Sequence, residues 1–322
     1  MTALSITRRT LLAGLAAGLA APALAQSDKP VRFILPNATG SGVDAITRAA
    51  QAALAKVLGH PIIVDNQPGA GGIVGLQALA RSAPDGLTLG IVSNNVVIFP
   101  SVLKSMPFDM PGDFTPVAIV GYTPVVLVVN AKVPAHNAKE FIALLKSRNG
   151  DMTYASGGNG TILHLASAMF LDEAKVSARH IPYKGVGPML TDLIGGQVDF
   201  ATAALPSVQA HLKSGALRAI GIATTQRVPA APEIPTFVEQ GLPDYVVEAW
   251  FAVMAPKGLP AAEVERVHAA VVTAFNDPEV KEAMAKQGNV INVGRADKAM
   301  PFFRSERARY AQLVKKAGVE AQ

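Results

Sequence analysis

Residues 40–45 read G-S-G-V-D-A and fit the spacing G-x-G-x-x-A, which is typical of the phosphate turn in dinucleotide-binding folds. An apolar run at residues 31–36 precedes this turn, and a helical pattern follows it. A second apolar run ends at Asp65, about twenty residues further on, where such folds place the acid that binds the ribose. Glycine lets the backbone approach a ligand closely, and a helix N-terminus presents unpaired amides to an anion. The turn therefore predicts an anion site, for which an NAD(P) cofactor is one candidate.

A second glycine-rich loop, S-G-G-N-G-T at residues 156–161, also follows a strand-like run and precedes a helical one. The backbone amides of residues 39–42 and 157–161 would then face a shared ligand from two helix N-termini. The hydroxyl groups of Thr39, Ser41 and Thr161 add further donors. No base or nucleophile stands evidently between the two loops, so the pattern indicates a clamp for a carboxylate rather than a catalyst.

Polar residues near these loops extend the candidate site. His164 lies in the first turn of the helix after the second loop, where it is either a partly buried structural residue or a donor to the cleft. Lys184 ends a strand in P-Y-K-G and is either a rim cation that attracts anions or a solvated charge. Asn94 belongs to the strand-end loop S-N-N. Asp44 lies in a first helical turn, where a carboxylate accepts backbone N–H groups, so we expect it to hold the first loop.

Several catalytic and metal-binding patterns are absent from the sequence. It contains no G-x-S-x-G, no H-E-x-x-H and no Gly-Lys dipeptide of a P-loop. There is no cysteine, and the six histidines are dispersed without the spacing of metal ligands. The 29 Lys and Arg against 24 Asp and Glu form no basic cluster. We therefore expect no metal, no cofactor and no nucleic-acid partner, and the slight positive balance suits an anionic ligand.

Strand-like and helix-like segments alternate in the order typical of parallel sheets flanked by helices. The run at residues 115–130 is too long for one ordinary strand, and we expect a break at residues 121–124, where the chain crosses between two domains. The sequence thus predicts an α/β fold in which each domain is a doubly wound mixed sheet flanked by helices. Domain 1 is discontinuous, at residues 26–124 and 229–322, and domain 2 is inserted at residues 125–228. In such a layout a ligand sits between the domains, at the C-terminal ends of the strands.

The first 25 residues predict a secretory signal peptide. Arg8 and Arg9 form its basic start, residues 11–21 form a short apolar segment, and residues 23–25 read A-L-A, a cleavage site. The stretch T-R-R-T-L-L partly matches a twin-arginine signal, although a Sec signal can also carry two arginines. No later apolar run reaches the roughly 20 residues of a membrane span. We therefore expect a soluble protein that is exported by the Sec or the twin-arginine route.

Three long motifs resemble segments of one protein family. The stretch V-D-N-Q-P-G-A-G-G-I-V-G at residues 64–75 resembles V-E-N-R-P-G-A-G-G-x-x-G, and residues 154–166 resemble Y-A-S-x-G-N-G-x-x-x-H-L-A. Residues 180–199 resemble H-V-P-Y-K-G-x-x-P-A-L-T-D-L-L-G-G-Q-V-D. These are signatures of the substrate-binding proteins of tripartite tricarboxylate transporters, the Bug family. The resemblance covers nearly all of residues 28–320.

The resemblance implies a two-domain periplasmic binding protein of the Venus-flytrap type, which closes around a small organic carboxylate and offers it to integral-membrane transporter subunits. We expect a monomer. In the family a ligand carboxylate is held by the loop after the first strand and by the G-N-G loop, and the loop near residue 202 would face the distal end of the ligand. Together with the residues above, the predicted ligand-binding set is Asn37, Ala38, Thr39, Gly40, Ser41, Gly42, Asn94, Ser156, Gly158, Asn159, Gly160, Thr161, His164, Lys184, Thr202 and Ala203.

The chain departs from the family pattern in two loops. Where the family reads P-F-x-P-G-G-G-T-D, residues 36–44 read P-N-A-T-G-S-G-V-D, so Asn37 replaces an aromatic residue and Ser41 a glycine. We expect Asn37 to hydrogen-bond the ligand. Residues 200–207, F-A-T-A-A-L-P-S, lack the acid or amide that the family often has there, which argues against an amino group at the distal end of the ligand.

Two other functions remain open on the sequence. One is an exported NAD(P)-dependent oxidoreductase, which the turn at residues 40–45 and the two arginines favour. A dehydrogenase, however, needs one phosphate turn and a separate catalytic set, whereas this chain has a glycine-rich loop at the cleft end of both domains. The other is a periplasmic sensor, which would use the same binding fold to signal through a membrane kinase.

Overall fold

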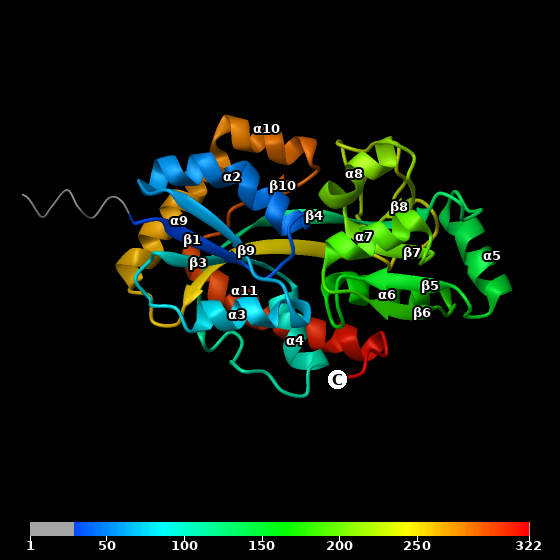
Figure 1. Ribbon diagram of the computed structural model, residues 1–322, viewed down its shortest axis with the longest axis horizontal. Helices are drawn as coiled ribbons and strands as arrows, with labels where there is room; N and C mark the ends of the chain where they lie inside the picture. The colour runs from blue at the N-terminus through cyan, green and yellow to red at the C-terminus, as the bar shows by residue number, and fades with distance from the viewer. Residues whose placement is uncertain (1–28, 322) are drawn as a thin grey trace, which may run out of the picture.

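Residues 29–321 are described in the computed structural model and form two lobes joined through one mixed sheet (Figure 1). The expected signal peptide lies outside these residues. The strand order is β2-β1-β3-β9-β4-β7-β5-β6, and β8 and β10 pair with β4 as well. Within the described range, no helix combines the length and the apolar character needed to cross a membrane. The predicted α/β class is confirmed, whereas the domain boundaries stay a prediction.

The first lobe draws on both ends of the described chain. Its strands are β1 (Val31–Leu35), β2 (Ile62–Asn66), β3 (Thr88–Ser93), β9 (Glu248–Pro256), β10 (Val290–Ile291) and the first part of β4 (Phe114–Asn130). The strands β1, β2 and β3 are parallel, and β9 lies antiparallel between β3 and β4. Its helices are α2 (Gly42–Leu58), α3 (Ile73–Ala80), α4 (Asn95–Val102), α9 (Ala261–Asn276), α10 (Pro278–Lys286) and α11 (Ala296–Lys316), with the 3-10 turn η2 (Ala70–Gly72) before α3.

The second lobe is made from one continuous stretch of chain. It contains the end of β4, β5 (Thr153–Ser156), β6 (Arg179–Pro182), β7 (Phe200–Ala204) and β8 (Leu217–Ile222), with the helices α5 (Ala138–Arg148), α6 (Ile162–Ala174), α7 (Val186–Gly195) and α8 (Leu205–Lys213). The strands β5, β6 and β7 are parallel, and β4 runs antiparallel to β7 and β8.

The two lobes are joined by β4, which is one strand of 17 residues. The expected break at residues 121–124 is therefore wrong. The strand stays continuous because its pairing partner changes along its length: β9 pairs with it as far as Pro124, and β7 pairs with it from Val125. Register shifts near residues 117, 120 and 127 let this strand bend while its backbone groups remain paired.

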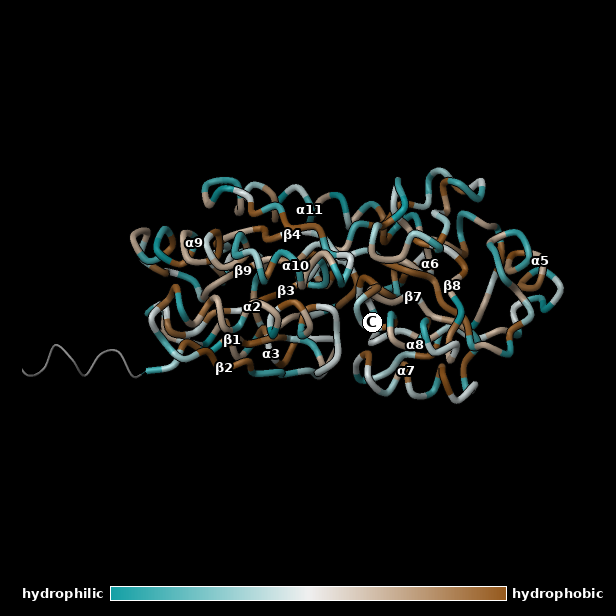
Figure 2. The backbone as a smooth tube through the Cα atoms, turned by 90° about the horizontal axis from the view of Figure 1, so that it is seen from above, coloured by the Kyte–Doolittle hydropathy of each residue, from teal (hydrophilic) through white to brown (hydrophobic). Residues whose placement is uncertain are grey.

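Apolar runs form the interior of both lobes. The strands β1 and β3 are almost completely buried, as expected for sheet strands covered by helices on both faces. Figure 2 shows hydrophobic segments along the central strands and hydrophilic ones on the outer helices and loops. One core cluster lies within the first lobe, between α2, α9 and the sheet, and a larger one continues from the first lobe into the second.

Short polar caps fix where two of the helices begin. The Ser41 hydroxyl accepts a hydrogen bond from the amide of Asp44 at 3.3 Å, and the Thr161 hydroxyl accepts one from the amide of His164 at 3.3 Å. Both hydroxyls serve as N-caps, because each accepts a hydrogen bond from a first-turn amide that has no partner within its helix. The helix α2 follows β1 after the loop at residues 36–41, and α6 follows β5 after the loop at residues 157–161. Both helices begin on the side where the lobes face each other.

Candidate functional site

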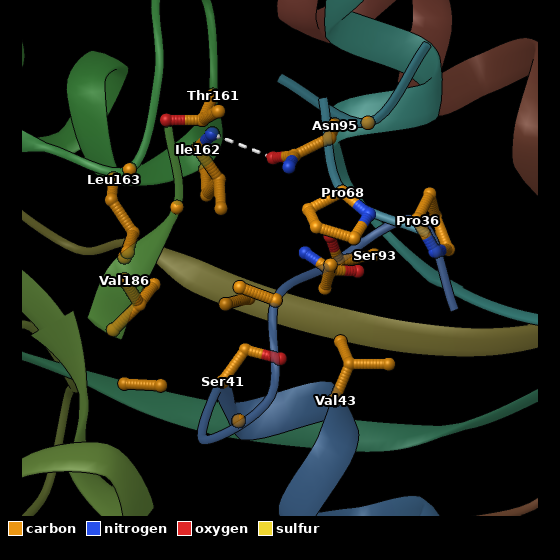
Figure 3. Close-up of a pocket in the computed structure, with 18 of the residues that line it drawn as sticks. Pro36, Ser41, Val43, Pro68, Ser93, Asn95, Thr161, Ile162, Leu163 and Val186 are labelled. Atoms are coloured by element: carbon orange, nitrogen blue, oxygen red, sulfur yellow. Dashed lines mark hydrogen bonds between the residues drawn. The ribbon is translucent and has the colours of Figure 1, made fainter. Parts of the chain in front are cut away.

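A cleft lies between the lobes, lined by the loops that follow the strands and by the first turns of the helices after them (Figure 3). The empty space between its walls is about 810 Å³, a figure that includes open solvent at its mouth. The first lobe contributes residues 36–38, 41–43 and 46, parts of the loop at 68–72, and residues 93, 95 and 123. The second lobe contributes residues 157, 161–163, 184–186, 204 and 207, and β9 contributes residues 249–251.

Helix N-termini from both lobes converge on this cleft. The helices α2 and α4 begin there in the first lobe, and α6, α7 and α8 begin there in the second. The lining residues at these five helix starts are Ser41 and Gly42, Asn95, Thr161 and Ile162, Gly185 and Val186, and Ala204. Each helix start carries a partial positive charge and amides without an intrahelical partner, so the cleft attracts an anion.

The charges on the lining agree with this. Lys184 is exposed at its edge, and no Asp or Glu belongs to the lining formed by the described residues. The nearby acid Asp44 accepts hydrogen bonds from the Gly40 amide at 3.0 Å and from Arg48 Nε at 2.9 Å. Burial raises the pKa of Asp44, but these hydrogen bonds outweigh it and hold the pKa below its ordinary value. Asp44 thus stays ionised and holds the first loop, which confirms the role expected from its position.

The amides of the two predicted loops are not equally available. In the first loop, no hydrogen bond within residues 29–321 uses the amides of Gly42 and Val43, so α2 offers both to a ligand. In the second loop, the Gly158 amide donates to Ser156 Oγ at 3.3 Å and the Gly160 amide donates to His164 Nδ1 at 3.1 Å. These two amides of the second loop therefore form hydrogen bonds within the second lobe and are not available to a ligand.

His164 supports the second loop from beneath. Its ring is buried, is stacked on His180 and accepts from the Gly160 amide, so it does not face the cleft. Burial lowers the pKa of His164 to about 3, with a smaller effect of His180, and burial lowers the pKa of His180 to about 4. Both rings are neutral near pH 7. Of the two roles that the sequence leaves open for His164, the geometry matches the structural one.

Six residues of the predicted set lie on the lining of the cleft: Asn37, Ala38, Ser41, Gly42, Thr161 and Lys184. Their contact with a ligand stays a prediction. The other ten lie off the lining: Thr39, Gly40, Asn94, Ser156, Gly158, Asn159, Gly160, His164, Thr202 and Ala203. Thr202 is buried and donates to the Leu163 carbonyl at 2.6 Å. At the end of β7 it is Ala204, with Ser207 in the next helical turn, that reaches the cleft.

The neighbouring residues Asn94 and Asn95 have different roles: Asn94 is part of the buried interior, and Asn95 lines the cleft. Asn94 is fully buried, and its Nδ2 donates to the Glu248 carbonyl at 2.9 Å and contacts the Tyr310 hydroxyl. Asn95 is the neighbour that lines the cleft. Sequence reasoning found the S-N-N loop but selected the inner asparagine.

Most of the lining that sequence reasoning missed is apolar: Val43, Ile46, Ile162, Leu163, Val186, Ala249, Trp250 and Phe251. In the sequence these residues look like ordinary core positions, so periodicity does not separate them from the interior. The one available signal is Trp250, the only tryptophan of the chain. Two neutral oxygens complete the lining, because Asn37 Oδ1 and Ser207 Oγ are buried without a hydrogen-bond partner among residues 29–321. A ligand donor that pairs with such an oxygen removes the cost of leaving it unsatisfied, which is about 1–3 kcal/mol, and so favours binding.

Comparisons with known proteins point to one group. The sequence model of a family described as the tripartite tricarboxylate transporter family receptor matches residues 46–319. Protein BugT of Bordetella pertussis is 35% identical over 308 residues, which is 94% of each chain. The structure of periplasmic binding protein BugD superposes with a TM-score of 0.87 at 29% identity, covering 91% of this chain and 99% of BugD. The structure of R. palustris Rpa4515 with adipate superposes with a TM-score of 0.88 at 26% identity, covering 92% of this chain and all of the other.

Proposed function

Because the chain belongs to the tripartite tricarboxylate transporter receptor family, we propose that it captures a small organic carboxylate in its cleft and delivers it to a membrane transporter of that type. The family and its solved members are solute-binding proteins rather than enzymes. The oxidoreductase alternative is therefore not retained, and the turn at residues 40–45 serves an anion other than a dinucleotide.

The observation that carries the proposal is the convergence of five helix N-termini from both lobes on a cleft without an acidic residue in its described lining. A carboxylate placed there meets the unpaired amides of Gly42 and Val43 and the positive ends of the helices. Because the helices come from two lobes, the anion interacts with both only when the lobes are together. The ligand thereby stabilises the closed arrangement by its differential affinity for it.

The rest of the lining supports an organic acid rather than an inorganic ion. Apolar side chains of both lobes, among them Val43, Leu163 and Val186, face the same space as the helix N-termini. An apolar ligand body would gain from leaving water here, while Asn37 and Ser207 offer neutral hydrogen-bonding oxygens. The adipate bound in the related structure is an acid of this general kind.

The family also supports a place of action. BugD is a periplasmic binding protein, and the first 25 residues of this chain read as an export signal, so we place the mature protein in the periplasm. Its expected partners are integral-membrane subunits of a tripartite tricarboxylate transporter. Co-purification from membranes tests this partnership: transporter subunits support it, and recovery of a sensor kinase instead would favour signalling.

A thermal-shift screen of mono- and dicarboxylates, aliphatic and aromatic, tests the binding function directly. We expect at least one acid to raise the melting temperature and to alter the fluorescence of Trp250, which lies on the cleft lining. The corresponding primary amide, which has the same shape without the charge, is the matched control and should bind much more weakly. Stabilisation by NADH and by none of the acids would refute the proposal.

A further inference from the structure

A buried hydrogen bond joins the two lobes inside the cleft. The Ile162 amide, at the start of α6, donates to Asn95 Oδ1, at the start of α4, over 2.8 Å (Figure 3). Both residues line the cleft, and both are buried, with exposed fractions of 5% for Ile162 and 8% for Asn95. The two first residues of these helices thus meet inside the site itself.

The geometry of both helix starts directs this bond. The first amide of a helix has no partner within the helix, and the N-cap hydroxyl of Thr161 is already used by the amide of His164. On the opposite side, the preceding residue Asn94 is tied to the Glu248 carbonyl, which fixes the turn and aims Asn95 across the cleft. Asn95 therefore caps a helix of the other lobe, and it does so only while the lobes are together.

Close packing next to this bond makes a continuous seam between the lobes, defined here by Gly71, Asn95 and Val102 against residues 158–162. A Cβ atom added to Gly160 would lie 2.2 Å from Val102 Cγ2, and one added to Gly158 would lie 3.3 Å from the Gly71 Cα atom. Both glycines have positive φ angles, so the backbone conformation and the short approach favour glycine together. The seam is built from protein atoms alone, so it contributes to closure independently of any ligand.

We propose that Asn95 is a cross-cleft cap, which stabilises the closed arrangement of the lobes and withholds the first amide of α6 from the ligand. The second part rests on the proposed binding function. It follows that α6 keeps only its second amide, that of Leu163, for a ligand, whereas α2 offers the amides of both Gly42 and Val43, which are unpaired among residues 29–321. A ligand carboxylate is therefore directed toward α2 in preference to the start of α6. Asn95 is then a positioning residue for closure and a selectivity residue for the anion.

Closure is measured first without any ligand. The chain has no cysteine, so Lys56→Cys in α2 and Lys213→Cys in α8, both exposed, accept a pair of dyes that report the distance between the lobes by energy transfer. Asn95→Ala should lower the closed fraction and shift the closed-to-open ratio by roughly five-fold, as expected for one net hydrogen bond. The control is Asn276→Ala, since Asn276 is exposed in α9 and bonds only its own helix. Equal closed fractions in the wild-type protein and Asn95→Ala would overturn the proposal.

Asn95→Asp separates the two parts of the role. It keeps an acceptor at the same place, so the closed fraction should equal or exceed that of the wild-type protein, because a carboxylate is a stronger cap. It also adds a negative charge to the lining, so affinity for the best carboxylate of the screen should fall by about ten-fold or more. Unchanged carboxylate affinity in Asn95→Asp would overturn the selectivity part.

Different results would refute the proposed function and the proposed role of Asn95. If the wild-type protein binds no carboxylate while Asn95→Ala still opens the lobes, the proposed function is wrong and the closing role of Asn95 stands. If carboxylates bind and neither Asn95 variant changes closure or affinity, this inference is wrong and the proposed function stands.

Discussion

The imidazole rings of His164 and His180 are stacked with their centroids 3.9 Å apart and an angle of 6° between their planes. The Tyr154 ring packs on the same stack, and Ser156 Oγ lies 2.7 Å from His180 Nε2. The stack joins β5, β6 and the start of α6, so it supports the loop at residues 156–161 from inside the second lobe. Two neutral rings can lie this close, whereas two imidazolium ions would repel each other.

Stability should consequently fall in weak acid. Burial lowers the pKa of His164 to about 3 and of His180 to about 4, below the value of about 6.5 for an unfolded histidine. The unfolded chain then binds more protons, so this stability is complete above about pH 6.5 and is lost as the pH falls toward the folded values. We expect the melting temperature to drop between pH 7 and pH 5, and to drop less in His180→Phe. His211→Gln, in α8, controls for the loss of one histidine. An equal pH slope in His180→Phe would contradict the assignment.

Gly42 and Gly40 should respond differently to the same added methyl group. A Cβ atom on Gly42 would lie 2.9 Å from the Ala204 Cβ atom of the other lobe, so Gly42→Ala should keep the lobes apart and weaken carboxylate binding about ten-fold or more. Gly40 has a φ of +81° and open space around its Cα atom, so Gly40→Ala should cost about 1 kcal/mol of stability and leave affinity nearly unchanged. Calorimetric titration and thermal melts of the two variants check this contrast. Similar affinities for both would show that closure tolerates the extra methyl group.

Lys184 should act mainly at long range. It is exposed at the edge of the lining, so Lys184→Ala should weaken carboxylate binding only about two- to five-fold, and Lys184→Glu should weaken it more. The effect should shrink as salt rises from 0.02 to about 0.5 M, because exposed charges are screened. Stopped-flow association rates at several ionic strengths measure this, with Lys213→Ala as the matched exposed control. A loss that does not depend on salt would point instead to a direct, desolvated contact.

Glu306 should stabilise the fold because its carboxylate accepts a hydrogen bond from Trp250, which forms part of the cleft wall. The Trp250 Nε1 group donates to Glu306 Oε2 at 2.8 Å, and Arg309 pairs with the same carboxylate. Glu306→Ala leaves the buried indole N–H unpaired and should lower the free energy of unfolding by about 1–3 kcal/mol. The fluorescence of Trp250, the sole tryptophan, should shift as its surroundings change. Glu263→Ala, at a partly exposed pair on α9, is the control. A normal melt for Glu306→Ala would show that the indole finds another acceptor.

Much of the fold follows from local sequence signals. The helix α6 begins where a helical run was expected after the second glycine-rich loop, because the Thr161 side chain caps its first turn. The strand β4 shows where local signals stop: Gly121 and Pro124 suggest a break, yet partners distant in the sequence keep the strand continuous. A pairing partner that changes along a strand is a property of the tertiary structure, and no local pattern contains it.

The site was predictable at the level of loops and less so at the level of side chains. The turn at residues 36–42 and the start of α6 do reach the cleft. Which of Asn94 and Asn95 faces it depends on the backbone direction at the end of β3, which two adjacent identical residues do not reveal. Leu163 and Val186 carry the same apolar character in a cleft wall as in a core, so composition does not distinguish the two. The hydrogen bonds inside the second loop decide which amides remain free, and these require coordinates.

The place of β9 in the sheet bears on how the chain folds. All strands of the second lobe have been synthesised by Ile222, whereas the first lobe lacks its strand between β3 and β4 until Pro256 has been made. Contacts between residues far apart in sequence form late, because the intervening chain must first be ordered. The second lobe can therefore assemble as a unit before the first lobe, which starts earlier in the sequence but is completed only when β9 has been made.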